Sequence, residues 1–178
     1  MAGAFMRKIR DAPIGRNRYD SGMATFRIRG LSPEPFTHLY GLDDAALAAQ
    51  GAKRYVVDEM PGFPDRIEMR DLEVGELALL VNYDHLPVDT PYRSSHAIFV
   101  REGATETYDS VNEIPEVMRS RLLSLRAFDS KGMMLDADVV DGNSIEALIG
   151  RFFENPDIEY IQVHNAKRGC YSGRIDRA

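Results

Sequence analysis

The side chains best suited to chemistry fall in two groups. The first lies in the run PYRSSHAIFVR, which begins at Pro91 and contains His96. The second is near the end of the chain, where His164 stands six residues before Cys170, the only cysteine. Histidine titrates close to neutral pH, and a cysteine beside a histidine and basic residues can act as a nucleophile with its base. We therefore predict His96, His164 and Cys170 as candidate catalytic residues; the alternative is an ordinary buried cysteine and a hydrogen-bonded histidine at a strand end.

Arginines near both groups predict a site for an anionic ligand. A guanidinium group binds carboxylates and phosphates through two parallel hydrogen bonds. The competing interpretation is that these arginines pair with acids such as Glu68 and Glu102 on exposed strand ends. The residues predicted to bind the ligand are Arg66, Tyr92, Arg93, Ser94, Ser95, Arg101 and Asn165, with Arg126, Arg174 and Arg177 as further candidates.

A metal site is a third arrangement that these residue types allow. Zinc accepts imidazole and carboxylate ligands, here His85, His96, His164 and an acid such as Asp84 or Asp89. The sequence has no HxxxH, HExxH or CxxC spacing, and sequence positions alone do not show that these histidines meet. We therefore expect no metal and no other cofactor.

Two classes of function stay open. The first is a small-molecule enzyme, hydrolytic or group-transferring, in which Arg93 and Arg66 hold an anionic substrate and His96 or His164 acts as acid or base. The second is a non-catalytic module that binds an anion or another ligand with the same residues. The sequence has no glycine-rich phosphate loop, no GxSxG motif and no dinucleotide-binding fingerprint, so no enzyme class with a standard motif is indicated.

Composition limits the partners. The chain has 178 residues, 44% of them hydrophobic, and a net charge of -6. This acidic balance disfavours binding to nucleic acid, which needs a basic face. No apolar run approaches the roughly 20 residues needed to cross a bilayer, and the N-terminus lacks the apolar core of a secretion signal. With a single cysteine, we expect a cytoplasmic protein that binds neither nucleic acid nor membrane; its oligomeric state is not indicated.

The elements that must position the two groups are mainly strands. Residues 77–81 and 96–100 are apolar enough for two central strands, joined by a polar loop over 82–93. A strand over 158–163 leads into the second group. We predict that His96, Arg93 and Arg66 converge with residues 164–170 on one cleft. The other predicted strands are 25–29, 54–57, 66–69, 122–128 and 133–140.

The clearest helix covers 145–153, with apolar residues on one face and Asn143 as its N-cap. Shorter helices are expected after Ser32 and after Asp43 or Asp44. We predict an α+β fold, with a mostly antiparallel mixed sheet of about six to eight strands. One long amphipathic helix and shorter helices pack on this sheet.

Length favours one domain, over 23–178, preceded by a flexible basic extension over 1–22. The extension has five basic and two acidic residues, a net charge of +3, which leaves -9 for the remaining residues. It has few apolar residues and no periodicity, so we expect it to be dispensable for stability.

Four runs carry a family resemblance: PGFPDR, GELALLVNY, PYRSSHAIFVR and VHNAKRGC, followed by Arg174 and Arg177. Together they resemble the bacterial family catalogued as domain of unknown function 1203, over about Phe26 to Arg177. The resemblance implies a bacterial source, and it supplies no activity, cofactor or catalytic residue. Many relatives have a cysteine where Asp65 stands, so a scheme that requires that thiol would fail here.

Overall fold

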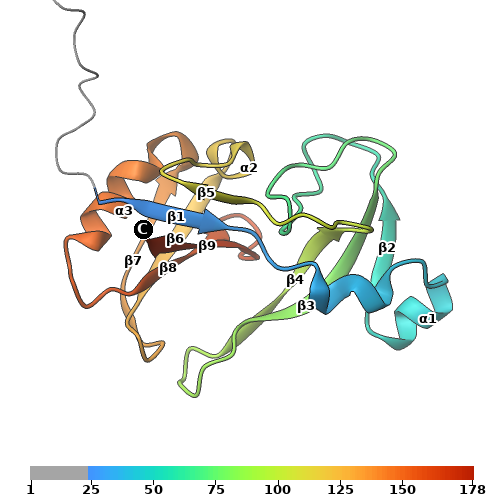
Figure 1. Cartoon of the computed structure of the whole chain (residues 1–178), viewed down its shortest axis with the longest axis horizontal. Coiled ribbons are helices and arrows are strands. Elements are labelled where there is room, and N and C mark those ends of the chain that lie inside the picture. Colours follow the sequence, from blue (N-terminus) through green and yellow to red (C-terminus); the bar gives the residue numbers. More distant parts are fainter. Residues whose placement is uncertain (1–23) are drawn as a thin grey trace, which may run out of the picture.

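The computed structural model describes residues 24–178, and in this part of the chain the strands form two sheets (Figure 1). The larger sheet contains β1 (Phe26–Arg29), β5 (Asp109–Val111), β6 (Leu122–Phe128), β7 (Met134–Asp141), β8 (Tyr160–Asn165) and β9 (Tyr171–Arg177). The smaller sheet contains β2 (Lys53–Val56), β3 (Leu77–Leu86) and β4 (Ser94–Arg101). The strand orders are β5-β1-β9-β8-β6-β7 and β2-β3-β4. Each pairing between these strands is antiparallel.

The helices are short and lie in the connections. They are the 3-10 helices η1 (Glu34–Leu39) and η2 (Gly142–Ser144) and the α-helices α1 (Asp44–Ala49), α2 (Glu116–Arg119) and α3 (Ile145–Phe153). α1 begins as predicted, because the Asp43 carboxylate accepts a hydrogen bond from the Ala46 backbone N–H at 2.8 Å. These elements confirm an α+β fold with mostly antiparallel strands. Within residues 24–178, no helix is long and apolar enough to cross a membrane.

α3 occupies the predicted residues and buries the predicted apolar face. With nine residues, however, it is not the long helix that we expected. Asn143 does not cap it, because this residue lies in the preceding turn η2. There its backbone N–H donates a hydrogen bond to the Asp141 carboxylate at 2.9 Å.

One face of the large sheet packs against α3. Side chains of a strand alternate between the two faces of a sheet, and in β6 Leu123, Leu125 and Ala127 are fully buried in the core that contains α3. β8 and β9 add Ile161, Val163 and Ile175 to this core. The alternate residues of β6 and β8 therefore point to the opposite face. Its polar members are Ser124, Arg126, Gln162 and His164.

This opposite face of the large sheet meets the small sheet, which Figure 1 shows beside it. A second core contains Leu79 and Val81 of β3, Ile98 and Val100 of β4, and Tyr171 at the start of β9. Tyr171 therefore joins the two sheets. η1 and α1 supply further apolar side chains to the same core, on the small-sheet side.

The two strands predicted as central differ from expectation. β3 continues to Leu86, so the first half of the predicted polar loop 82–93 is strand. β4 is an edge strand and not a central one. An isolated bridge between Asp65 and Phe99 places another segment along that edge, which explains why β4 is as apolar as a central strand.

Residues 66–69, predicted as a strand, form an irregular turn. The Asp65 carboxylate accepts hydrogen bonds from the backbone N–H groups of Ile67 and Arg101, at 3.2 and 2.7 Å, and from that of Glu68. An aspartate that binds the backbone ahead of it favours a turn over a sheet ladder. β5 and β9 were not predicted at all. β9 combines Gly173 with three charged residues, which conceals its alternation.

Candidate metal centre

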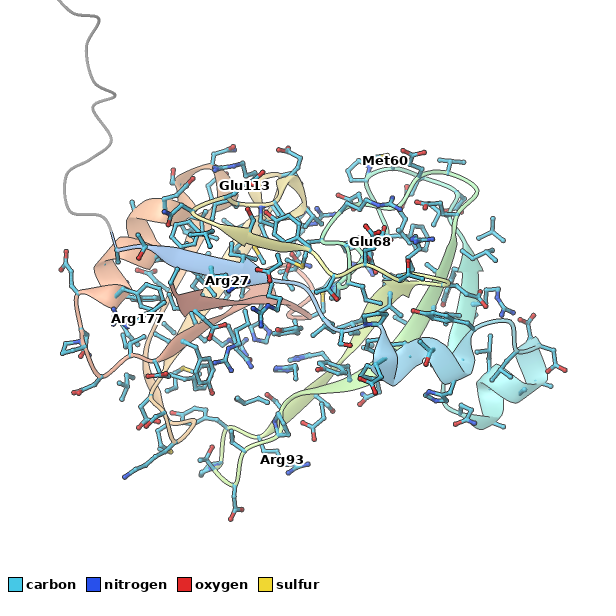
Figure 2. All side chains as sticks on the ribbon, in the orientation of Figure 1. Arg27, Met60, Glu68, Arg93, Glu113 and Arg177 are labelled. Carbon is cyan, nitrogen blue, oxygen red and sulfur yellow. The ribbon has the colours of Figure 1, made fainter. Side chains whose placement is uncertain are left out.

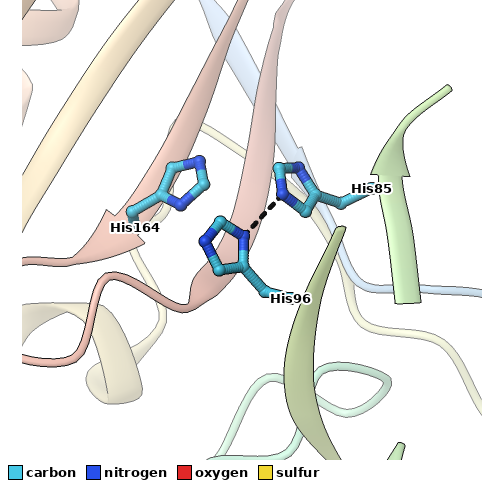
Figure 3. Close-up of side chains that lie close together, drawn as sticks. All are labelled: His85, His96 and His164. Carbon is cyan, nitrogen blue, oxygen red and sulfur yellow. Dashed lines mark hydrogen bonds between the residues drawn. The ribbon is translucent and has the colours of Figure 1, made fainter. Parts of the chain in front are cut away.

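Three histidines from three strands meet where the two sheets face each other (Figure 3). His85 lies on β3, His96 on β4 and His164 on β8. One ring nitrogen from each lies within 4.8 Å of the others. His85 is 8% exposed and His164 is fully buried, whereas His96 is partly exposed. The three rings therefore form a small polar cluster with one side toward solvent.

Strand alternation brings the rings together. In β4, His96 shares a face with Ile98, which belongs to the second core. It pairs with Tyr83 of β3. His85 follows Tyr83 by two residues and so lies on the same face, where its ring stacks on that of His96 with centroids 4.8 Å apart and an interplanar angle of 18°. His164 reaches the same place from the opposite sheet, with its centroid 5.1 Å from that of His85.

A glutamine fixes the protonation of His85. The Gln162 side-chain N–H group donates a hydrogen bond to the His85 backbone carbonyl at 2.9 Å. The other amide atom, Oε1, therefore faces His85 Nδ1, also at 2.9 Å. An amide oxygen can only accept a hydrogen bond, so Nδ1 carries the proton. The lone pair of His85 is then on Nε2.

His164 is fixed in the same way. Its Nδ1 lies 3.0 Å from the Gly169 carbonyl oxygen, which can only accept, so Nδ1 carries the proton and Nε2 the lone pair. This Nε2 is buried and has no hydrogen-bond partner among residues 24–178. His85 Nε2, by contrast, lies 2.7 Å from His96 Nδ1 and accepts a hydrogen bond from it. Two imidazoles thus have their Nδ1 atoms held by protein oxygens and their Nε2 lone pairs directed elsewhere.

The imidazoles are neutral at neutral pH. Burial lowers the pKa of His164 to about 3 and that of His85 to about 4. Burial also lowers the pKa of the more accessible His96. The positive charge of Arg126 adds to the lowering at each of the three rings. Neutral imidazole is the form that coordinates a metal ion.

The spacing is close to that of a metal site. Nitrogen ligands bind zinc at about 2.0–2.1 Å in a tetrahedral arrangement, which places the nitrogens about 3.3 Å apart. The observed upper limit is 4.8 Å, so shifts of about 1 Å close the site. The hydrogen bond between His85 and His96 would be replaced, with the proton of His96 moving from Nδ1 to Nε2. The rings can therefore act as three nitrogen ligands.

Tyr171 forms one wall of this histidine cluster. Its ring stacks on His85, with centroids 4.9 Å apart and an interplanar angle of 11°, and meets His164 edge-on. The backbone of Tyr171 leads to two other predicted residues. Arg66, which is 2% exposed, donates from Nε to the Tyr171 carbonyl at 2.9 Å and from Nη2 to Cys170 Sγ at 3.2 Å. Burial lowers the pKa of this arginine.

The other predicted ligand-binding residues do not form one group. Arg93 pairs with Asp84 at 2.6 Å, and Arg101 pairs with Glu68 at 2.6 Å. These two arginines lie at opposite ends of β4, about 25 Å apart at the usual rise of a strand, and Figure 2 shows Arg93 and Glu68 well separated.

Four further predicted residues lie in different surroundings. The Tyr92 ring packs edge-on against Phe128, and Asn165 donates to Cys170 Sγ at 3.4 Å. Ser94 pairs with Leu86 in the sheet, and Ser95 is exposed.

The three histidines were predicted from the sequence, and Arg126 was a further candidate for the anion, but Gln162 and Tyr171 had no predicted role. One signal was available for Gln162: it is a polar residue inside the apolar run YIQV, two positions before His164, which places both on one face of a strand. Tyr171 lies on β9, which was not predicted.

No curated protein and no solved structure matches this chain significantly. A family match covers residues 62–177, well over half of the 178 residues. It includes all three histidines, Gln162 and Tyr171. The resemblance seen in the sequence is thereby confirmed, and the chain belongs to the family described as Protein of unknown function (DUF1203).

Proposed function

We propose that this domain binds a divalent transition-metal ion through His85, His96 and His164. The observation that carries the proposal is the fixed orientation of two rings. The Nδ1 atoms of His85 and His164 each donate to a protein oxygen, which directs both Nε2 lone pairs away from these oxygens. The lone pair of His164 has no partner within residues 24–178, and that of His85 accepts only the hydrogen bond from His96, which a metal would replace. Metal-binding histidines typically donate their second ring N–H to such an acceptor. Gln162 and the Gly169 carbonyl would be these supporting groups.

The alternative is that the three histidines only pack against Tyr171 in the protein interior and bind no metal. This explains the stacking of His85 on Tyr171, but it leaves His164 Nε2 buried without a partner within residues 24–178. A buried polar atom without a hydrogen bond costs about 1–3 kcal/mol. A metal ion removes this cost, and so the metal site accounts for more of the geometry.

The ligand set indicates the kind of ion. Imidazole suits zinc, iron, copper and nickel, whereas magnesium and calcium prefer oxygen ligands. Three protein ligands leave at least one coordination position open, which is typical of catalytic sites and not of structural zinc sites. A zinc ion can activate water by lowering its pKa to about 7. We therefore favour a metal-dependent small-molecule enzyme, hydrolytic or group-transferring, over a module that binds its ligand without turnover.

Zinc titration of the chelator-stripped full chain tests this function. We expect one Zn²⁺ per chain by calorimetry and, at 100-fold excess over Kd, a rise in melting temperature of about 5–10 °C. His85→Asn and His164→Asn should each abolish both effects. His38, the fourth histidine, is exposed on η1 and provides a matched control: His38→Asn should bind zinc like the parent. Equal binding by all three variants would sink the proposal.

A further inference from the structure

Arg126 lies beside the histidine cluster on the large sheet. It pairs with Gln162 in the register between β6 and β8, and its neighbour Ser124 pairs with His164. Leu125 and Ala127 on either side are fully buried toward α3, so the Arg126 side chain is on the face that carries Gln162 and His164. The guanidinium group is therefore near the cluster but not part of it.

The positive charge of Arg126 has no counter-charge among residues 24–178. Within residues 24–178 its guanidinium group makes no ion pair and no side-chain hydrogen bond, and burial alone lowers its pKa. The fully buried Arg66, in contrast, donates to carbonyl oxygens and to Cys170. Arg168 also lacks such a partner there, but it is exposed in the turn between β8 and β9. A partly buried arginine without a partner is costly unless something else supplies negative charge.

The field of this arginine reaches all three rings. Arg126 pairs across the sheet with Gln162, which contacts His85, and its positive charge adds to the lowering of the pKa of His85, His96 and His164. The carboxylate that acts on His85 in the opposite sense is Asp84, and its Oδ2 is already held by Arg93 at 2.6 Å. With a divalent ion on three neutral ligands, ion and arginine together carry a charge of +3. That total favours an anion between them.

We propose that Arg126 binds an oxyanion, a carboxylate or phosphate group of a small molecule, which at the same time coordinates the metal ion on His85, His96 and His164. The inference rests on the proposed function and names its substrate class. A guanidinium fork can hold two oxygens of a phosphate while a third oxygen takes the open coordination position; a carboxylate would place one oxygen on the guanidinium group and the other on the metal. This assigns the anionic substrate expected from the sequence to Arg126, in place of Arg93 and Arg101.

Anion binding to the Co²⁺-loaded full chain tests the inference, because the visible spectrum of bound Co²⁺ reports its coordination. Inorganic phosphate and oxalate are added separately at fixed ionic strength, to distinguish the two oxyanion types. We expect at least one of them to change the spectrum saturably. Arg126→Gln should keep Co²⁺ binding and lose about tenfold or more in affinity for that anion. Arg126→Lys, which keeps the charge but not the fork, should lie between the two.

Arg168→Gln is the matched control, because it removes an exposed arginine that also lacks a partner, and it should behave as the parent. An anion affinity unchanged in Arg126→Gln, with Co²⁺ still bound, would overturn the inference and leave the metal site standing. No spectral response to either anion in the Co²⁺-loaded parent would overturn it as well. A parent that binds no metal would instead refute the proposed function, a result that the zinc titration gives independently.

Discussion

Two polar regions beside the small sheet differ in whether their charges and lone pairs have partners. At the end of β4 that holds Arg101 lies an arginine–carboxylate network of Glu68, Arg70, Glu76 and Arg101. Arg70 bonds both carboxylates, at 2.8 and 2.7 Å, and Arg101 bonds Glu68 at 2.6 Å. Near the other end lies the histidine cluster, where His164 Nε2 and, beside it, Arg126 have no partner among residues 24–178.

This difference distinguishes a structural region, the arginine–carboxylate network, from a candidate binding site, the histidine cluster. A network in which each charge has a partner gains nothing from a ligand, and it serves to hold irregular backbone in place. A region that retains lone pairs and a charge without partners is stabilised by what it binds. Groups with shifted pKa values gather at functional sites, but they also occur in structural ion pairs. The missing partners of His164 Nε2 and Arg126 within residues 24–178 are therefore more informative here than the pKa shifts.

We expect the largest effect from removing the Asp65 side chain, which holds the irregular backbone beside the arginine–carboxylate network. Asp65 accepts hydrogen bonds from three backbone N–H groups, so Asp65→Ala leaves these donors without partners in a buried place. We expect a loss of about 2–4 kcal/mol in the free energy of unfolding. Urea unfolding measures it. Zinc affinity of the folded variant should match the parent, and a parallel loss of zinc binding would erase the distinction between the two regions.

Replacing Gln162, which supports His85, should weaken metal binding and leave the arginine–carboxylate network intact. Gln162→Leu removes the acceptor that holds the proton on His85 Nδ1. Loss of such a supporting group lowers metal affinity about 10–100-fold, which calorimetric zinc titration can measure. Gln162→Glu keeps an acceptor oxygen at the same position and should retain most of the affinity. If both variants bound zinc like the parent, Gln162 would have no role in positioning His85.

Lowering the pH should destabilise the arginine–carboxylate network over a defined pH range. The hydrogen bond from Arg70 lowers the pKa of Glu76 to about 2 from its ordinary 4.5. A carboxylate with a lowered pKa stabilises the folded state above the unfolded pKa, and this stability is lost as pH falls from about 4.5 to about 2. Solvent screening reduces the contribution to about 1 kcal/mol. Glu76→Gln should therefore differ from the parent at pH 7 but converge with it near pH 2 in denaturant unfolding; a constant difference would contradict this assignment.

The smallest effect is expected at Arg93. Its side chain is 62% exposed and pairs with Asp84 at the hairpin end of β4, so Arg93→Ala should change the free energy of unfolding by less than about 1 kcal/mol. It should also leave the anion response of the Co²⁺-loaded protein unchanged. If Arg93→Ala abolished that response while Arg126→Gln did not, the anion would bind where the sequence alone indicated.

Local patterns were enough for much of the fold. Alternation and apolar runs located β6, half of β3 and most of β4, and helical periodicity located α3. The same reasoning failed where a side chain competes with backbone pairing, as Asp65 does. It also failed for β9, where Gly173 and the charged residues conceal the alternation.

The site needed information that no local pattern contains. His96 and His164 were named as candidates from their residue type, but they meet only because the small sheet packs against one face of the large sheet. His85 joins them because β3 continues through residues that the sequence indicates as a polar loop. That Arg126 has no partner in the described part of the chain is likewise a property of the packed sheets, since acids are abundant in the sequence.

The most direct test of the metal centre is anomalous diffraction at the zinc edge from crystals of the full chain grown with Zn²⁺. We predict an anomalous peak bound by ring nitrogens of His85, His96 and His164 at about 2.0–2.1 Å, with an open position on the side of Arg126. Zinc found only at surface carboxylates or at His38, with the hydrogen bond between His85 and His96 intact, would contradict this metal centre.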